Sequence, residues 1–234
     1  MNRRRTQFTF VLALMGALPP LSVFSQGRLG NGTFQNLDFS AAKVVFIDNS
    51  NVAIETGPAL PDWNVSIGGI TPSTMSYNDY SLSTANVALF GPTPPGAGGN
   101  DAVVLQGGAF VQYGNTSLQQ TGMAPVGANS IQFQSSTYPY YPTSINAFGF
   151  GVNGQAVNLV PFSNGKGWTY AGNISQYAGQ SATLDFYSLS GGSPTSFYLS
   201  DITFSSQVIP EPAPLPLFGI GALALVARPR GRRN

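Results

Sequence analysis

The side chains that could perform acid–base chemistry are few in this chain. Outside the last 27 residues there are eight carboxylates: Asp38, Asp48, Glu55, Asp62, Asp79, Asp101, Asp185 and Asp201. A glycosidase uses two carboxyl groups about 5–10 Å apart, one of them with a raised pKa. No pair here has an informative spacing, and most lie beside Asn, Gly or Pro, where Asp commonly serves turns. The sequence therefore predicts a protein that is not an enzyme, with a secreted carbohydrate-active enzyme (glycoside hydrolase or lyase) as the alternative.

Two residue types that carry much enzyme chemistry are missing. The chain has no Cys and no His, which excludes thiol nucleophiles, disulfides, Cys/His zinc sites and Ser-His-Asp triads. A Ser-Lys mechanism would need Lys43 or Lys166, and nothing near either lysine resembles a nucleophile motif.

Aromatic side chains give a better case for binding. Tyr138, Tyr140 and Tyr141 lie in a proline-punctuated loop, and Trp63 and Trp168 lie near turns. Such rings stack on the apolar faces of sugars, so the three tyrosines are candidate sugar-stacking residues. The alternatives are that Trp63 and Trp168 pack in the core and that the tyrosine loop covers a sheet edge.

The elements that must position these side chains are short strands. Segments rich in Val, Ile, Phe, Tyr and Thr recur between Gly, Pro, Asn and Ser clusters, which predicts an all-β fold: a single antiparallel β-sandwich over residues 26–207. Residues 181–187 and 197–204 alternate apolar and polar side chains, as half-buried strands do. The other expected strands are 34–39, 44–47, 63–67, 85–90, 102–105, 109–113, 130–133, 147–152, 155–161 and 166–171.

The N-terminus has the three parts of a secretory signal. Arg3, Arg4 and Arg5 precede an apolar run over residues 8–18, and small residues follow, so cleavage after Ser25 is expected. The apolar run falls short of the roughly 20 residues that span a bilayer, which disfavours an uncleaved anchor. Residues 1–25 are therefore predicted to be a signal peptide.

Charge is concentrated at the two ends of the chain. Once the terminal arginines are set aside, three basic residues remain against nine acidic ones, a net charge of −6. A domain of that sign with no basic patch repels phosphate backbones, so nucleic acid is excluded as an expected partner.

The last 27 residues, 208–234, combine three features. Pro210, Glu211 and Pro212 come first, an apolar run follows over residues 215–227, and Arg228, Arg230, Arg232 and Arg233 end the chain. The run, as a helix, is about 20 Å long, short of the roughly 30 Å hydrocarbon core, and the arginines favour the cytoplasmic side. The alternative, a buried C-terminal helix, leaves the arginine cluster unexplained.

This order resembles the PEP-CTERM sorting domain of Gram-negative bacteria, although the apolar run is short. The resemblance implies export through the inner membrane, transient retention there, and processing near the PEP motif by an exosortase-type enzyme. It also implies delivery to the cell envelope, cell surface or extracellular matrix, in association with exopolysaccharide and biofilm.

Three stretches of the body carry a second resemblance. They are GTFQNLDF at 32–39, LPDWNV at 60–65, and NISQYAGQSATL at 173–184 followed by YLSDI at 198–202. Their order resembles galactose-binding-like jelly rolls of bacterial surface proteins. That resemblance implies a jelly-roll sandwich and, at Asp38 and Asp201, a structural Ca²⁺ where the first and last strands meet. Ser40 and Ser200 stand where that pattern often has a carboxylate, which calcium would need.

Together these observations predict a protein of the cell envelope or extracellular matrix with a structural or adhesive role. Exopolysaccharide is a candidate ligand. No cofactor is expected, with the calcium ion that the resemblance implies as the alternative; without that ion, Asp38 and Asp201 are surface or turn residues on exposed faces.

Overall fold

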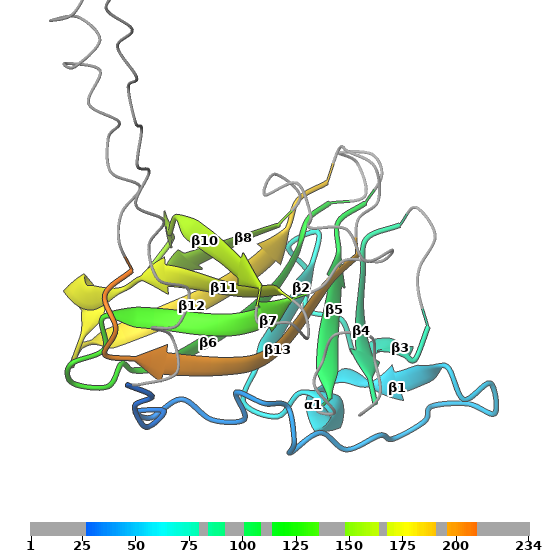
Figure 1. Ribbon diagram of the computed structural model, residues 1–234. Coiled ribbons are helices and arrows are strands. Elements are labelled where there is room, and N and C mark those ends of the chain that lie inside the picture. The colour runs from blue at the N-terminus through cyan, green and yellow to red at the C-terminus, as the bar shows by residue number, and fades with distance from the viewer. Residues whose placement is uncertain are drawn as a thin grey trace, which may run out of the picture.

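The fold is an all-β sandwich, as the sequence predicted, and is consistent with a jelly roll. The computed structural model describes residues 27–79, 84–91, 101–108, 114–135, 148–163, 168–190 and 196–209. Within these ranges thirteen strands form two sheets, and the helical elements are the single turn α1 (Thr56–Ala59) and the 3₁₀ turn η2 (Ser175–Tyr177). The smaller sheet lies against β13, β7, β11 and β10 of the larger sheet, whose remaining strands extend to the right in Figure 1.

The larger sheet has eight strands, and all its pairs are antiparallel except β3 with β4. In spatial order they are β1 (Ala53–Glu55), β3 (Thr74–Tyr77), β4 (Asn86–Phe90), β5 (Ala102–Gln106), β13 (Ser196–Ser205), β7 (Ser130–Ser135), β11 (Trp168–Asn173) and β10 (Leu159–Ser163). β13, the last of the described strands, thus lies in the middle of this sheet.

The smaller sheet has five antiparallel strands. In spatial order they are β2 (Asn64–Ile67), β6 (Thr116–Met123), β12 (Ser181–Ser188), β8 (Phe148–Val152) and β9 (Gln155–Ala156).

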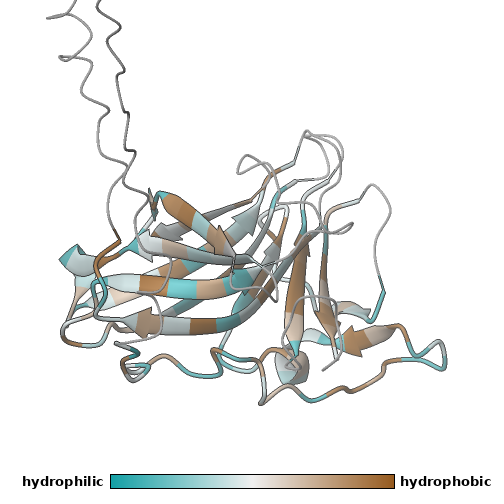
Figure 2. Ribbon diagram, viewed as in Figure 1, coloured by the Kyte–Doolittle hydropathy of each residue, from teal (hydrophilic) through white to brown (hydrophobic). Residues whose placement is uncertain are grey.

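An aromatic cluster fills the space between the sheets. Along β12 the even-numbered residues are buried and the odd-numbered ones are partly exposed, as the alternation predicted. Phe186 points inward from β12 and meets Phe133 of β7 edge-on at 5.1 Å between ring centroids. Phe133 also contacts the rings of Phe150, Tyr170 and Phe197. In Figure 2 brown and teal bands follow one another along some of the strands, whereas β5, which is buried along its whole length, is mainly brown.

Two expected strands take another form. Residues 34–39 contain turns, because Asn36 and Phe39 have positive φ, yet Phe34, Leu37 and Phe39 are buried in the core. Residues 44–47 form one isolated bridge, Phe46 to Ile54, beside β1. The strand at residues 34–39 was predicted from these apolar side chains. They are buried, but turns in the backbone, and not an extended strand, bring them into the core.

Several predicted segments lie outside the described residues. They are the signal peptide, the expected strand at 109–113, the tyrosine loop, and the tail from Pro210 onward with its apolar helix. Within the described ranges, no helix is both long and apolar enough to cross a membrane.

Candidate functional site

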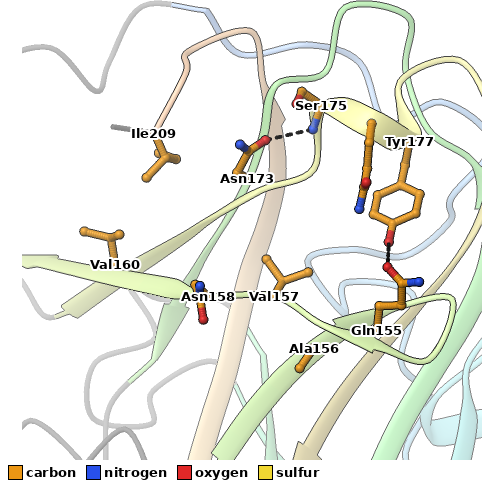
Figure 3. A pocket seen from close by; sticks show the side chains of 10 residues that line it. Gln155, Ala156, Val157, Asn158, Val160, Asn173, Ser175, Tyr177 and Ile209 are labelled. Atoms are coloured by element: carbon orange, nitrogen blue, oxygen red, sulfur yellow. Dashed lines mark hydrogen bonds between the residues drawn. The ribbon is translucent and has the colours of Figure 1, made fainter. Parts of the chain in front are cut away.

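A pocket of about 400 Å³ lies beside the point where the described chain ends (Figure 3). The connection from β9 to β10 forms one wall, the end of β11 and η2 form another, and Ile209 closes the pocket. Its volume is within the range of small-molecule sites, about 300–1,000 Å³. The lining residues are Gln155, Ala156, Val157, Asn158, Val160, Asn173, Ser175, Gln176, Tyr177 and Ile209.

Local hydrogen bonds hold Tyr177 in the pocket wall. The Asn173 side-chain oxygen accepts the Ser175 N–H at 3.0 Å and so starts the turn, as Asn commonly does. The Tyr177 hydroxyl donates to the carbonyl of Val152 at 3.3 Å and lies 3.4 Å from Oε1 of Gln155. Ile174, with 1% exposure, anchors the turn in the core. The ring of Tyr177 is therefore fixed relative to β8 and β9.

The pocket lining is uncharged and rich in hydrogen-bonding groups. Four side-chain amides and two hydroxyls stand among aliphatic side chains, and none of the lining residues is Asp, Glu, Lys or Arg. Amides and hydroxyls both donate and accept hydrogen bonds. This chemistry suits a neutral ligand that carries many hydroxyl groups.

A second candidate site lies on the outward face of the five-stranded sheet. Asp185 of β12 stands opposite Gln119 of β6 and Gly151 of β8. Burial raises the pKa of Asp185, and a hydrogen bond with Gln119 opposes that shift. The Oδ1 atom of Asp185 is buried without a hydrogen-bond partner. A half-buried carboxyl group of this kind is a functional-site candidate on physical grounds.

Glycines shape the surface next to Asp185. A Cβ atom at Gly149 would collide with the ring of Tyr187, which stands opposite it. The ring of Tyr187 therefore lies across β8 at Gly149, and any larger residue at position 149 would displace it. Tyr187 follows Asp185 by two residues and shares its face, so the pair presents an aromatic ring beside a carboxyl group.

Asp38 and Asp201, the predicted calcium ligands, come from segments that the structure does bring together. The N–H of Ile202 donates to the carbonyl of Leu37 at 3.1 Å, which places the two aspartates on neighbouring segments. Oδ1 of Asp38, however, already accepts both the N–H and the hydroxyl of Ser40, at 3.2 and 2.8 Å.

Burial raises the pKa of Asp101, and the negative charge of Asp38 raises it further, so Asp101 lies near Asp38. Even so, no group of three or more His, Cys, Asp or Glu side chains in the described part of the chain could hold a metal ion. Asp38 and Asp201 therefore do not belong to a cluster of this kind, and calcium at these residues stays a prediction.

The aromatic predictions have mixed outcomes. Trp63 packs in the core with 7% exposure, its ring N–H donates to the carbonyl of Asn36 at 3.0 Å, and Trp168 packs partly buried against the core. Tyr138, Tyr140 and Tyr141 lie outside the described residues.

The sequence reasoning did not identify Tyr177 and Tyr187 as candidate site residues. Tyr177 belongs to the Tyr-Ala-Gly-Gln stretch on which the jelly-roll resemblance rests, so this motif could have identified it. For Tyr187 the sequence offered only its outward position in an alternating strand.

Comparisons with known proteins identify no family. No protein-family model matches the chain, and no curated protein matches it. A solved structure of a Stig cyclase from Fischerella sp. TAU, in complex with (3Z)-3-(1-methyl-2-pyrrolidinylidene)-3H-indole, is 14% identical with a TM-score of 0.42; the match covers 74% of this chain and 96% of that one. An apo form of a cyclase from Fischerella sp. is 14% identical with a TM-score of 0.35, covering 74% and 94%.

One sequence-based prediction is corrected at this point. The protein was expected not to be an enzyme, whereas both of these similar structures are of cyclases. The expectation is contradicted by that finding and is not carried forward. What the two cyclases bind or convert is not transferred to this chain at 14% identity.

Proposed function

We propose that this protein is exported to the cell envelope or extracellular matrix, where its β-sandwich binds a neutral polysaccharide. Support for export comes from the basic and apolar N-terminus and from the Pro-Glu-Pro, apolar and arginine-rich order of the tail. Support for binding comes from the pocket between η2 and the β9–β10 connection.

The observation that carries the binding proposal is the chemistry of this pocket. Sugars offer hydroxyl groups for hydrogen bonds and apolar faces for contact with rings and aliphatic side chains. The pocket has amides from Gln155, Asn158 and Gln176, the ring of Tyr177, and an aliphatic floor that includes Val160. A charged ligand would find no ionic partner in this lining.

The position of the pocket is relevant to an envelope protein. Ile209 lines the pocket and directly precedes Pro210, the first residue of the sorting motif. In our proposal the polysaccharide is therefore bound next to the segment that an exosortase-type enzyme processes. Binding there would keep the carbohydrate close to the anchoring end of the chain.

Binding is tested with the purified protein on a glycan array and by calorimetry with the producing cell's own exopolysaccharide. Asn158→Ala removes a pocket amide and Tyr177→Phe removes the hydroxyl but keeps the ring. Each lost hydrogen bond costs about 0.5–1.5 kcal/mol, so a roughly 2- to 10-fold weaker affinity is expected. Asn64→Ala, an exposed amide on β2 away from the pocket, is the matched control.

Two results would contradict the binding proposal. One is the absence of saturable binding to any glycan. The other is an equal loss of affinity in the Asn64→Ala control, which would move the site away from the pocket.

Sorting is tested separately by replacing Pro210, Glu211 and Pro212 with alanine. The expected result is that the variant accumulates in the inner membrane while the parent protein reaches the surface or medium. Replacing Arg228, Arg230, Arg232 and Arg233 with Gln is expected to weaken the retention step instead. An unchanged distribution in both variants would refute the sorting role of the tail.

A second candidate function is that of a carbohydrate-active enzyme, and Asp185 is the observation that favours it. A carboxyl group whose pKa is raised by burial can act as a general acid. Its cross-strand neighbours are Gln119 and Gly151, so the opposite positions supply no second carboxylate. Release of reducing ends from the polysaccharide, lost in Asp185→Asn, would establish this activity.

A further inference from the structure

A strip of exposed apolar side chains runs along one free edge of the larger sheet. Four consecutive residues are each about two-fifths to one-half exposed: Val44 at 38%, Val45 at 39%, Phe46 at 41% and Ile47 at 49%. They lie beside β1, the first strand of the eight-stranded sheet. Figure 1 shows this segment as the blue trace below β1, and Figure 2 shows brown along it. A flat apolar edge of this kind is a template for pairing with another strand.

The backbone of this edge segment, residues 43–48, is bonded on one side. The carbonyl of Val45 accepts the N–H of Glu55 at 2.9 Å, and the N–H of Ile47 donates to the carbonyl of Ala53 at 3.1 Å. Phe46 faces Ile54 as a pair that exchanges no hydrogen bonds with each other. Because successive residues point their backbone groups to opposite sides, those of Val44 and Phe46 point away from β1.

The two edges of the larger sheet differ in their proline content. β10 forms the edge opposite to β1 and carries Pro161, which has no N–H to donate. Residues 44–47 contain no proline and no charge. Phe46 is also held in place, because its ring meets that of Tyr77 edge-on at 5.7 Å.

We propose that the edge segment is a self-association surface, through which two copies of this chain pair antiparallel with Val45 of one copy opposite Val45 of the other. In this register Val44 of each copy stands opposite Phe46 of the other. Those two residues carry the outward N–H and C=O groups, so they can exchange hydrogen bonds across the dimer axis. The two eight-stranded sheets then continue across the interface.

Charge at the ends of the segment favours the antiparallel arrangement and a second copy as the occupant. Lys43 precedes the four apolar residues and Asp48 follows them. In an antiparallel pair the Lys43 end of each copy lies at the Asp48 end of the other, whereas a parallel pair would bring like charges together. In the proposed register Lys43 stands opposite Ile47, next to Asp48, so the two ends attract each other without forming a direct ion pair. The charge order of the segment therefore favours a second copy as the antiparallel partner.

The test uses single-cysteine variants of the full chain, which has no cysteine of its own. Val45 lies at a position whose backbone groups point to β1, so across the new interface it forms a non-hydrogen-bonded pair with Cα atoms about 4.5 Å apart. That spacing suits a disulfide. Val45→Cys is expected to form a covalent dimer under mild oxidation, seen on a non-reducing gel.

Two matched controls accompany this variant. Val126→Cys places the thiol on a side chain that is 86% exposed, away from the edge segment, and is expected to stay monomeric. Ile47→Cys keeps the thiol within the edge segment but stands opposite Lys43 in the proposed register, so it too is expected to stay monomeric.

Sedimentation velocity gives a second measurement without cysteine. Phe46→Lys puts a charge on each copy at the centre of the edge and is expected to weaken dimerisation at least about tenfold. Val126→Lys is its control. Three results would overturn the proposal: Val45→Cys stays uncrosslinked, Val126→Cys or Ile47→Cys crosslinks as readily, or Phe46→Lys leaves the dimer fraction unchanged.

Discussion

Replacing Asp185 with asparagine is expected to stabilise the fold at neutral pH. The carboxyl group of Asp185 is half-buried, one of its oxygens has no hydrogen-bond partner, and its pKa is raised by burial. An acid whose pKa is higher in the folded state binds its proton more readily there than in the unfolded state. The folded state therefore loses stability as pH rises from the unfolded pKa through the folded pKa.

The size of the effect follows from the burial of this one group. Asparagine keeps a polar atom at the position of the unpaired oxygen but carries no charge, so the gain comes from removing a partly desolvated charge. Desolvating an ion fully costs several kcal/mol, and only a small part of that applies because Asp185 is half-buried. Asp185→Asn is thus expected to raise the free energy of unfolding by about 1 kcal/mol at pH 7. Near pH 3 the wild-type group is protonated and neutral, so the difference is expected to vanish.

Urea unfolding at the two pH values measures this difference. Tryptophan fluorescence reports it, since Trp63 lies in the core with its ring 6.2 Å from that of Phe186 on the same strand as Asp185. With a slope of about 2 kcal/mol per molar urea, the midpoint shift is roughly 0.5 M. Asp48→Asn, at a fully exposed carboxyl group, is the control and is expected to give no gain. Destabilisation by Asp185→Asn at pH 7, or an equal gain at both pH values, would refute this reasoning.

Three further substitutions test the fold. Phe133→Ala removes the centre of the aromatic cluster and is expected to lower the free energy of unfolding by about 3–5 kcal/mol in urea melts; a loss below about 1.5 kcal/mol would contradict its place in the core. Gly32 has a φ of +64°, and a Cβ atom added there would collide with the carbonyl oxygen of Met123. Gly32→Ala is therefore expected to lower the Tm measured by calorimetry, and an unchanged Tm would refute this close approach. Burial alone would raise the pKa of Asp38, but hydrogen bonds from Ser40 and the charge of Arg28 lower it. Its contribution is therefore present at neutral pH and lost as pH falls. The wild type is expected to lose slightly more stability than Asp38→Asn between pH 6 and pH 3, and superimposable stability curves would refute that role.

The sequence predicted the strands whose apolar residues alternate. β12 lies where it was expected, because its inward side chains are apolar and face the core between the sheets. β13 also lies where it was expected, but it does not alternate throughout: Ser196 to Ser200 are all buried, and the register shifts between Ser200 and Thr203, where Asp201 has a φ of 52°. β6 was missed because its inward face includes Thr116 and Gln120. The side chain of Gln120 bonds to the backbone N–H and carbonyl of Gln35, at 2.7 and 2.9 Å. Gln35 is far from Gln120 in sequence, so the local sequence around Gln120 does not predict that its buried amide has a partner.

The candidate site was harder to predict from the sequence than the fold. The pocket depends on η2, which packs against the end of β8 through a hydrogen bond from the hydroxyl of Tyr177 to the carbonyl of Val152. These residues are 25 positions apart, and Tyr177 lies in a 3₁₀ turn outside both sheets, whereas Val152 belongs to the five-stranded sheet. Asp185 could be placed on an outward face by alternation, but its raised pKa depends on what surrounds it in space. The spacing of residues in the sequence predicts neither the pocket nor the raised pKa of Asp185.

The central place of β13 has a consequence for how the chain becomes folded. β13 comes last in sequence among the described strands, yet it pairs with both β5 and β7 and joins the two halves of the larger sheet. The N-terminal segment also depends on it, because Leu29 donates to the carbonyl of Phe204 at 2.9 Å and the rings of Phe34 and Phe204 stack. Contacts of such long range form late. An exported chain with this topology would cross the membrane without a finished core and would fold on the far side, after residue 205 has emerged.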